Sequence, residues 1–359
     1  MRNRPADYDH ILVPGNNKQS LEDQHENFII MANILKEKSG NKINLFKTGT
    51  FTKTALDLFD RTCKTVFPDP ILQDEAIWLE KAKFKAMIFA VPCSGKMYNY
   101  DFVSLYPSIM RSPGSLFPIK KGHYKYISQA EFYDMKPLPF GIYKCVVEKS
   151  ENVKINKQFV FNNKNYYTHL DLVLARELNL NIILFADTPN ALLWDRKHLL
   201  TGQQLFAEFV DLLFDLKQQK IDGSKQILNC LWGSLCEMNK IPLKIKNNQN
   251  KNTEIDSDMT LLSLRPLDKN TTIVEVIKND KYYETNFARI CPFILSYGRL
   301  KISRAIRPHI DSIVRVHTDG FLSTKELNIE TGTNLGEIKL DIYQNCKVYN
   351  NIRIDKNHG

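Results

Sequence analysis

The sequence has neither a long hydrophobic run nor a signal-peptide pattern. Its longest apolar stretches, such as 86–91 and 181–186, fall far short of the roughly 20 residues that a membrane-spanning helix needs. Charged side chains are spread through residues 1–14, where a signal peptide would have its apolar centre. The expected protein is therefore intracellular, has no membrane partner and is not secreted.

Paired cysteine motifs are also absent. The cysteines are scattered along the chain and odd in number, at Cys63, Cys93, Cys145, Cys230, Cys236, Cys291 and Cys346. No CxxC pair occurs, which argues against a disulfide framework and against a zinc ribbon. Reduced thiols in an intracellular protein are the expected state.

The composition is that of a folded, basic protein. The chain has 359 residues, enough for two or three domains. Hydrophobic residues make up 43% and charged residues 25%, so a sizeable core can form and wholesale disorder is excluded. Lys and Arg number 49 against 40 Asp and Glu, a formal net charge of +9 that suits a polyanion such as nucleic acid. Basic proteins without such a partner are common, so charge alone leaves both classes open.

Hydrophobic periodicity predicts helices and strands that do not alternate regularly. Helices are expected at 27–38, 52–61, 74–83, 168–177, 203–220, 224–238 and 292–307. Strands are expected at 86–91, 97–103, 141–148, 157–161, 181–186, 259–264, 271–277, 312–317 and 321–323. The helices at 203–220 and 224–238 form a helical hairpin. Because a doubly wound sheet requires regular alternation, the predicted fold class is α+β.

The first candidate for chemistry is Asp101, in the run YDFVSLYPSI at 100–109. It closes an apolar predicted strand, and a compact turn follows. A buried carboxylate is costly there unless it is paired or bound to a cation, which favours a magnesium ligand. The structural alternative is a cap for the following helix, although Ser104 is the more natural cap.

A second aspartate, Asp319, lies in the run VRVHTDGFL at 314–322, a predicted strand–turn–strand. An Asp-Gly hairpin tip without a metal is the simpler alternative. Two aspartates at strand ends are nevertheless what two-metal phosphoryl transfer requires. Magnesium takes one or two carboxylates and completes its shell with water and substrate phosphate.

The third group is Lys225, Asn229 and Trp232, which share one face of a predicted helix at i, i+4 and i+7. That face combines a cation, an amide and an aromatic plate, which suit a triphosphate, a base edge and a stacked base. The alternative is an amphipathic surface helix with a snorkelling lysine and a core tryptophan.

Together the three segments resemble motifs A, B and C of family B DNA polymerases, in the same order. The segment 101–109 matches the pattern DxxSLYPSI, and 225–233 matches KxxxNxxYG with Trp232 where the family usually has Tyr. The segment 317–320, HTDG, corresponds to DTDS with two changes. The resemblance covers about 44–345 and leans toward the organellar and viral members, which are often protein-primed.

This resemblance implies a polymerase palm, an antiparallel sheet backed by helices, with a helical-hairpin fingers subdomain. The implied divisions are 1–95, an N-terminal segment leading into the palm (a remnant of the exonuclease–palm connection); 96–200, the first part of the palm with motif A and an insertion; 201–240, the fingers with motif B; and 241–359, the second part of the palm with motif C. The Asp-x-Glu motif of the family's exonuclease domain occurs nowhere in the sequence, and 40 residues follow Asp319. No complete exonuclease domain is therefore expected, and little or no thumb.

The implied function is template-directed DNA synthesis. A nucleotidyl group would pass from a dNTP to a primer 3′-hydroxyl, or to the hydroxyl of a protein primer, with release of pyrophosphate. Two Mg²⁺ ions would be held by Asp101, Asp319 and the backbone of Phe102. The implied partners are a DNA primer–template, dNTPs and a terminal protein primer, the last associated with an insertion at about 120–164.

The same motifs imply the substrate-binding residues. Tyr106 matches the residue under the sugar that excludes a ribose 2′-hydroxyl, and Lys225 matches the lysine that grips the triphosphate. Asn229 and Trp232 would line the nascent base pair. The complete implied set is Phe102, Ser104, Leu105, Tyr106, Lys225, Asn229, Trp232 and Gly233.

One departure from the family pattern bears on the metal. His317 replaces the first aspartate of motif C. Neutral imidazole is a poor magnesium ligand and a better manganese ligand, so Mn²⁺ is expected to be preferred.

The alternative function is a catalytically impaired polymerase fragment that only binds nucleic acid, whereas an RNA-synthesising enzyme fits Tyr106 poorly. The source stays open between a mitochondrial linear plasmid, a virus and an integrated nuclear copy.

Four further cations flank these motifs. Lys217, Lys220, Arg299 and Lys301 are expected on a solvated surface, with contacts to phosphate or to the DNA backbone as the alternative.

Overall fold

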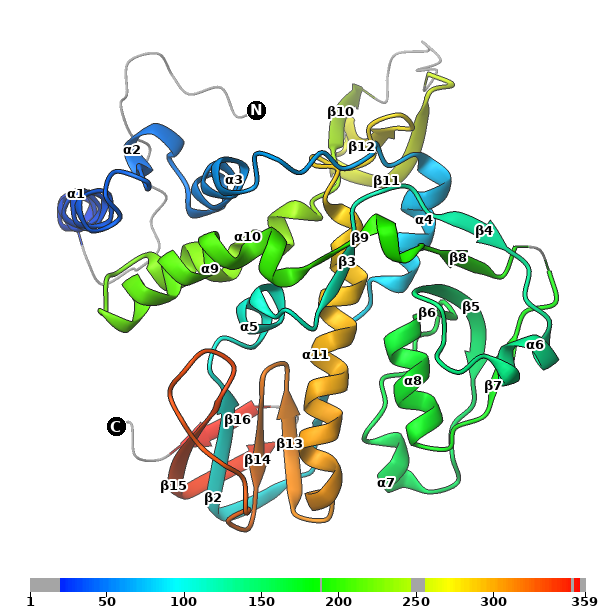
Figure 1. Cartoon of the computed structure of the whole chain (residues 1–359). Coiled ribbons are helices and arrows are strands. Elements are labelled where there is room, and N and C mark those ends of the chain that lie inside the picture. The colour runs from blue at the N-terminus through cyan, green and yellow to red at the C-terminus, as the bar shows by residue number, and fades with distance from the viewer. Residues whose placement is uncertain (1–19, 188, 247–255, 350–351, 356–359) are drawn as a thin grey trace.

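The computed structural model describes residues 20–187, 189–246, 256–349 and 352–355 (Figure 1). Its helices are α1 (Leu21–Lys38), α2 (Leu45–Thr48), α3 (Phe51–Thr62), α4 (Gln73–Ala82), α5 (Leu105–Arg111), α6 (Gln129–Asp134), α7 (Val153–Asn156), α8 (His169–Glu177), α9 (Gly202–Gln218), α10 (Ser224–Leu235) and α11 (Cys291–Ile306). Its strands are β1 (Ile88–Ala90), β2 (Cys93–Phe102), β3 (Leu116–Pro118), β4 (His123–Lys125), β5 (Gly141–Val147), β6 (Tyr166–Thr168), β7 (Ile182–Leu184), β8 (Ala191–Leu193), β9 (Leu199–Thr201), β10 (Lys240–Lys246), β11 (Met259–Asp268), β12 (Thr271–Lys278), β13 (Ile313–His317), β14 (Gly320–Ser323), β15 (Ile338–Tyr349) and β16 (Ile352–Asp355).

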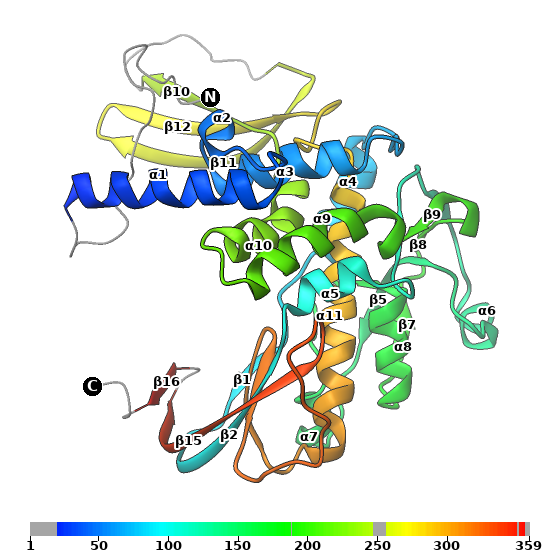
Figure 2. The same cartoon turned by 60° about the vertical axis from the view of Figure 1, so that its left-hand side comes forward.

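A six-stranded antiparallel sheet runs in the order β1-β13-β14-β2-β15-β16. Along β2, Tyr98, Tyr100 and Phe102 alternate with Asn99 and Asp101, so the two sets point to opposite faces of the sheet. Tyr100 and Phe102 are buried in the main core with apolar residues of α11. Figures 1 and 2 show α11 running along this side of the sheet. The face that carries Asp101 is not covered by a helix of the described residues.

The helices α9 and α10 form the predicted antiparallel hairpin, packed against α5 and α3. One stripe of α9 is buried, comprising Leu205, Phe206, Phe209, Leu213 and Leu216. The helix begins with a capping box between Thr201 and Gln204. Gly223 turns the chain into α10 with a φ of +83°, and a side chain there would lie 2.8 Å from Leu35 of α1. The hairpin thereby contacts α5 and also the N-terminal helices α1 and α3.

A second core lies beside α11. Strands β4, β8, β5 and β6 pair in that order, β7 pairs with β5, and α8 packs on them. A separate three-stranded sheet has the order β10-β12-β11. Its strand β11 contacts α4 through a hydrogen bond from the side-chain amide of Gln73 to the hydroxyl of Thr260, at 2.7 Å. The mixture of helices and antiparallel sheets agrees with the predicted α+β class.

Most helix predictions are confirmed. The predicted helices at 52–61, 74–83, 168–177, 203–220 and 292–307 are present, with ends that differ by two residues at most. Helix α1 begins at Leu21, earlier than the predicted 27–38, because the Ser20 hydroxyl accepts a hydrogen bond from the N–H of Asp23 at 3.0 Å.

The strand predicted at 157–161 is wrong. Phe159 and Val160 are buried, which explains the apolar signal, but their backbone is irregular. The N–H of Asn162 donates to the hydroxyl of Tyr167 at 2.8 Å. A side chain, and not a neighbouring strand, therefore satisfies the hydrogen-bonding capacity of this backbone N–H.

Other strand predictions need smaller corrections. The strand at 86–91 exists as β1, but it is an edge strand and not a buried one, and Ile88 is 40% exposed. Strands β3, β4, β6, β8, β9, β10, β15 and β16 were not predicted. In β10 and at the start of β15, apolar residues do alternate with charged ones, so this signal was present in the sequence and was overlooked.

Candidate active site

Asp101 lies in β2, and Asp319 lies in the turn directly before β14, the neighbouring strand of the six-stranded sheet. Strands β2 and β14 pair with Asp101 opposite Gly320, and the N–H of Phe102 donates to the carbonyl oxygen of Asp319 at 2.9 Å. Thr318 makes the tight turn between β13 and β14 with a φ of +62°. The register of the sheet therefore brings together two carboxylates that are far apart in the sequence.

Gly320 is needed for this close approach. A Cβ atom at this position would lie 2.5 Å from Oδ1 of Asp101 and 3.0 Å from the carbonyl oxygen of Tyr100. Any side chain at 320 would thus require the Asp101 carboxylate to rotate. The comparison with DTDS shows only that a glycine replaces the family's serine here, so the need for a glycine next to Asp101 is an additional finding.

Both carboxylates are in an environment that disfavours their charge. The pKa of Asp101 is raised to about 6, chiefly by burial and further by the charges of Asp319 and Asp341. Lys225 and Lys339 act in the opposite direction. Burial also raises the pKa of Asp319. Two half-buried carboxylates that repel each other would be stabilised by a bound cation.

The donor atoms at this position suit a hard divalent ion. Mg²⁺ takes one or two carboxylates and fills its other positions with water and phosphate oxygens. Among the described residues no group of three or more His, Cys, Asp or Glu side chains converges on a metal position. Two carboxylates with backbone carbonyl oxygens nearby are compatible with a magnesium site that is completed by substrate.

Ser104 has a different role from the predicted helix cap. It occupies the N-cap position of α5 with a φ of +52°, but its side chain makes no capping hydrogen bond. Its hydroxyl instead accepts a hydrogen bond from Nζ of Lys217, on α9, at 2.7 Å. Lys217 is half-buried, and burial together with the neighbouring charge of Lys225 lowers its pKa. The structure therefore adds Lys217 to the candidate site.

Tyr106 and Trp232 meet in a gap between α5, α10 and α11. Their ring centroids are 5.2 Å apart with an interplanar angle of 39°. Gly298 of α11 makes room for the tyrosine, since a Cβ there would lie 3.0 Å from Cε1 of Tyr106. Burial raises the pKa of Tyr106 to about 12, so its hydroxyl stays protonated. A cavity of about 500 Å³ borders both rings.

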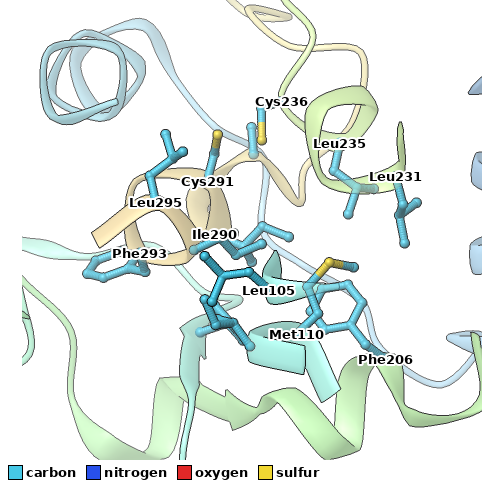
Figure 3. Packing of buried hydrophobic residues seen from close by; sticks show 14 of the residues in the cluster. Leu105, Met110, Phe206, Leu231, Leu235, Cys236, Ile290, Cys291, Phe293 and Leu295 are labelled. Atoms are coloured by element: carbon cyan, nitrogen blue, oxygen red, sulfur yellow. The ribbon is translucent and has the colours of Figure 1, made fainter. Parts of the chain in front are cut away.

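Leu105, by contrast, does not face the site. Its side chain is 1% exposed and packs in the main core near Phe206 and Ile290, as Figure 3 shows. The prediction of Leu105 as a substrate-binding residue is not supported for its side chain.

One exposed face of α10 carries the remaining predicted residues. Lys225, Asn229 and Gly233 are exposed and Trp232 is half-buried, as the i, i+4, i+7 spacing predicted. The positive charge of Lys225 counteracts the rise in the pKa of both Asp101 and Asp319, so the lysine lies near enough to the two carboxylates to interact with them. No atom lies within 4 Å of a Cβ built at Gly233, so this end of the face is open.

Two residues of the site were missed in the sequence. Lys339 of β15 pairs with Asp101 in the sheet, and Asp341 pairs with Asn99. Lys339 and Asp341 form an ion pair at 2.8 Å. Their spacing of two residues in a strand was the available signal, because it places both on the face that carries Asp101.

The four flanking cations have different surroundings. Lys220 is exposed, as expected. Lys301 is half-buried. The surface prediction is wrong for Arg299, which is 2% exposed and forms a bidentate ion pair with Asp171 of α8, at 2.9 and 3.0 Å. Arg299 therefore joins α11 to α8 and is not accessible to a DNA backbone.

The sequence matches no protein-family model and no curated protein sequence. Among solved structures, the chain is similar to phi29 DNA polymerase complexed with single-stranded DNA, with a TM-score of 0.62 and 16% identity over 99% of this chain and 64% of that one. The same polymerase complexed with primer–template DNA gives a TM-score of 0.59 and 18% identity over 97% and 61%. Its ternary complex with primer–template DNA and incoming nucleotide substrates gives 0.60 and 16% over 92% and 59%.

The chain thus spans less than two thirds of the length of the polymerases that it resembles. At these identities the similarity concerns the fold. Helices long and apolar enough to cross a membrane are not found in the described part of the chain. The arrangement of helices and antiparallel sheets in this protein is that of a DNA polymerase-like fold.

Proposed function

We propose that this protein carries out template-directed DNA synthesis as the palm and fingers portion of a family B DNA polymerase. The observation that supports the proposal most strongly is that Asp101 of β2 and Asp319, directly before β14, lie next to each other and near Lys225 of α10, in a polymerase-like fold. In this assignment the six-stranded sheet is the palm and the α9–α10 hairpin is the fingers.

The proposed metal centre lies where β2 ends and β14 begins. Asp101, Asp319 and the carbonyl oxygen of Phe102 would hold two Mg²⁺ ions. When bound, such ions lower the pKa of a primer 3′-hydroxyl and neutralise the charge that develops on pyrophosphate. The absence of a side chain at Gly320 leaves room for the Asp101 carboxylate, and the hydrogen bond from the N–H of Phe102 to the carbonyl oxygen of Asp319 holds the two segments together.

The substrate would lie between the strand ends and α10. Lys225 is placed to bind the triphosphate of a dNTP, with Lys217 beside it holding the turn at Ser104. Asn229, Trp232 and Gly233 would contact the nascent base pair. The half-buried ring of Tyr106, held between Gly298 and the tryptophan, would lie under the sugar and exclude a ribose 2′-hydroxyl.

Three finer points rest on the sequence resemblance. The similarity to organellar and viral polymerases suggests a terminal protein as primer. His317 is exposed at the end of β13, next to the carboxylates, and favours Mn²⁺ over Mg²⁺. The divisions at residues 95, 200 and 240 are those of the palm and fingers in the family.

The test is extension of a labelled primer on four templates that differ in the first templating base, with Mg²⁺ and with Mn²⁺. The complementary nucleotide should be added in each case, and Asp319→Asn should abolish the addition. Asp311→Asn is the matched control, because Asp311 is an exposed carboxylate paired with Lys154. Absence of extension by the wild-type chain, with retained salt-sensitive DNA binding, would instead support an impaired fragment that only binds nucleic acid.

A further inference from the structure

A second cavity lies between helix α5, helix α11 and the loop that contains Gly336. It has a volume of about 500 Å³. Its polar lining includes the serines Ser108, Ser112 and Ser115 and the cations Lys301 and Arg304. None of these residues has a part in the proposed polymerase reaction.

Lys301 brings an uncompensated positive charge into this cavity. Its Nζ donates to the carbonyl oxygen of Gly336 at 3.1 Å and lies 4.8 Å from the ring centroid of Phe102. Within the described part of the chain, Lys301 forms no ion pair with a carboxylate. A half-buried ammonium group with donors to spare is stabilised by an anion.

The neighbouring turn of α11 adds to this charge. Arg304 and Arg307 both pair with the single carboxylate of Glu177, the second at 3.0 Å. One carboxylate therefore serves two arginines, of which Arg304 lines the cavity together with Lys301. The excess positive charge makes the cavity a favourable place for a group with two negative charges.

Hydroxyl donors complete the lining. Ser112 Oγ accepts a hydrogen bond from the N–H of Gly114 at 3.2 Å, which leaves its own O–H able to donate. Ser108 Oγ donates to the carbonyl of Leu105 at 2.7 Å and can turn toward a stronger acceptor in the cavity. Cations combined with hydroxyl donors are the usual partners of phosphate oxygens.

We propose that this cavity is a phosphate-binding site, in which Lys301 and Arg304 supply the charge and Ser112 a hydrogen bond. Its volume falls in the range of small-ligand pockets and exceeds what a phosphate group alone would fill. The site therefore has room for a larger molecule that carries the phosphoryl group, either a free nucleotide or a nucleic-acid strand. The site is separate from the one that contains Asp101 and Asp319.

The test compares the intact chain with Lys301→Met, Arg304→Gln and the control Lys154→Met, whose side chain is exposed. Binding of inorganic phosphate, of 5′-AMP and of a single-stranded oligonucleotide without a terminal phosphate is measured by calorimetry. We expect Lys301→Met to weaken binding of at least one probe about ten-fold or more, since a hydrogen bond to a charged group is lost. Lys154→Met should bind as the wild type does.

The pattern of probes identifies the source of the phosphate. A loss confined to phosphate and 5′-AMP assigns the cavity to a free nucleotide, and a loss confined to the oligonucleotide assigns it to a nucleic-acid backbone. Equal binding of all three probes by wild type and Lys301→Met overturns the proposal. Lys301→Met removes a half-buried charge that has no ion pair among the described residues, so the variant should fold; if it does not, Arg304→Gln decides by the same criteria. Because binding is measured directly, the result does not depend on primer extension.

Discussion

Nζ of Lys217, on α9, donates a hydrogen bond to Oγ of Ser104 at 2.7 Å, although the two residues are 113 positions apart in the sequence. Ser104 has a left-handed backbone conformation directly after β2, three residues beyond Asp101. The contact therefore joins the α9–α10 hairpin to the strand end that carries a candidate metal ligand.

Lys217→Met should impair nucleotide binding more than the chemical step. The variant removes a cation beside Lys225 and releases the turn at Ser104, so the KM for dNTP is expected to rise about ten-fold with a smaller change in kcat. Steady-state primer extension measures both constants. Lys220→Met is the matched control, because Lys220 is exposed, and equal effects of the two substitutions would refute the assignment.

Arg299→Met should destabilise the fold strongly. It leaves Asp171 buried without its partner, and breaking a buried ion pair in this way costs about 3–5 kcal/mol. Arg304→Met breaks an exposed pair with Glu177 and should cost less than about 1 kcal/mol. Urea unfolding of the two variants provides the comparison, and similar midpoints would show that the Arg299 pair contributes little.

His169 should make the protein sensitive to mild acid. Its ring is enclosed between Phe140 and Phe293, and its Nδ1 accepts a hydrogen bond from the N–H of Gly141 at 3.4 Å. Burial lowers its pKa to about 4, from 6.5 in the unfolded chain. The unfolded state thus takes up a proton between pH 6.5 and 4 that the folded state does not. This histidine's contribution to stability falls in that range by about 1.4 kcal/mol per pH unit.

Substitution isolates the histidine from other titrating groups. His169→Asn keeps a hydrogen-bond acceptor but cannot be protonated in this range, so its urea midpoint should decline less between pH 7 and pH 5. His123→Asn, at an exposed position of β4, should retain the decline of the wild type. Identical pH profiles for wild type and His169→Asn would contradict the expected role.

Gly298→Ala tests whether Gly298 sets the position of the Tyr106 ring. The added methyl group would lie 3.0 Å from Cε1 of the tyrosine, closer than ordinary contact, and would shift the ring toward Trp232 and the proposed sugar position. We expect a several-fold increase in the KM for dNTP. Gly114→Ala is the control, since its Cβ would meet only the Ser112 hydroxyl, at an ordinary 3.7 Å. Unchanged kinetics in Gly298→Ala would show that Gly298 does not control the position of the tyrosine ring.

The sequence was informative where local pattern and chemistry coincide. The shared helix face of Lys225, Asn229 and Trp232 follows from their spacing alone; the structure leaves the first two exposed and Trp232 half-buried. Asp101 and Asp319 were each predicted at a strand end, which is where β2 and β14 bring them together. The structure adds the register of the two strands, which no local pattern specifies.

Contacts between distant segments could not be predicted in this way. Arg299 was expected at the surface because its partner Asp171 is 128 residues away, and nothing near either residue indicates the pair. In the sequence, Lys217 does not differ from other surface lysines. Its hydrogen bond to the Ser104 hydroxyl depends on the left-handed turn at Ser104, which only the structure shows. Lys339 and Asp341 join the site only through the pairing of β15 with β2.

The most direct test of the central claim is the number of Mn²⁺ ions that the chain binds, measured by electron paramagnetic resonance in the presence of primer–template and a non-hydrolysable dNTP. If Asp101 and Asp319 form one metal centre, the wild-type chain binds two ions. Asp101→Asn and Asp319→Asn should each lose binding, while Asp311→Asn binds as the wild type does. Undiminished Mn²⁺ binding by both substituted chains would contradict the account.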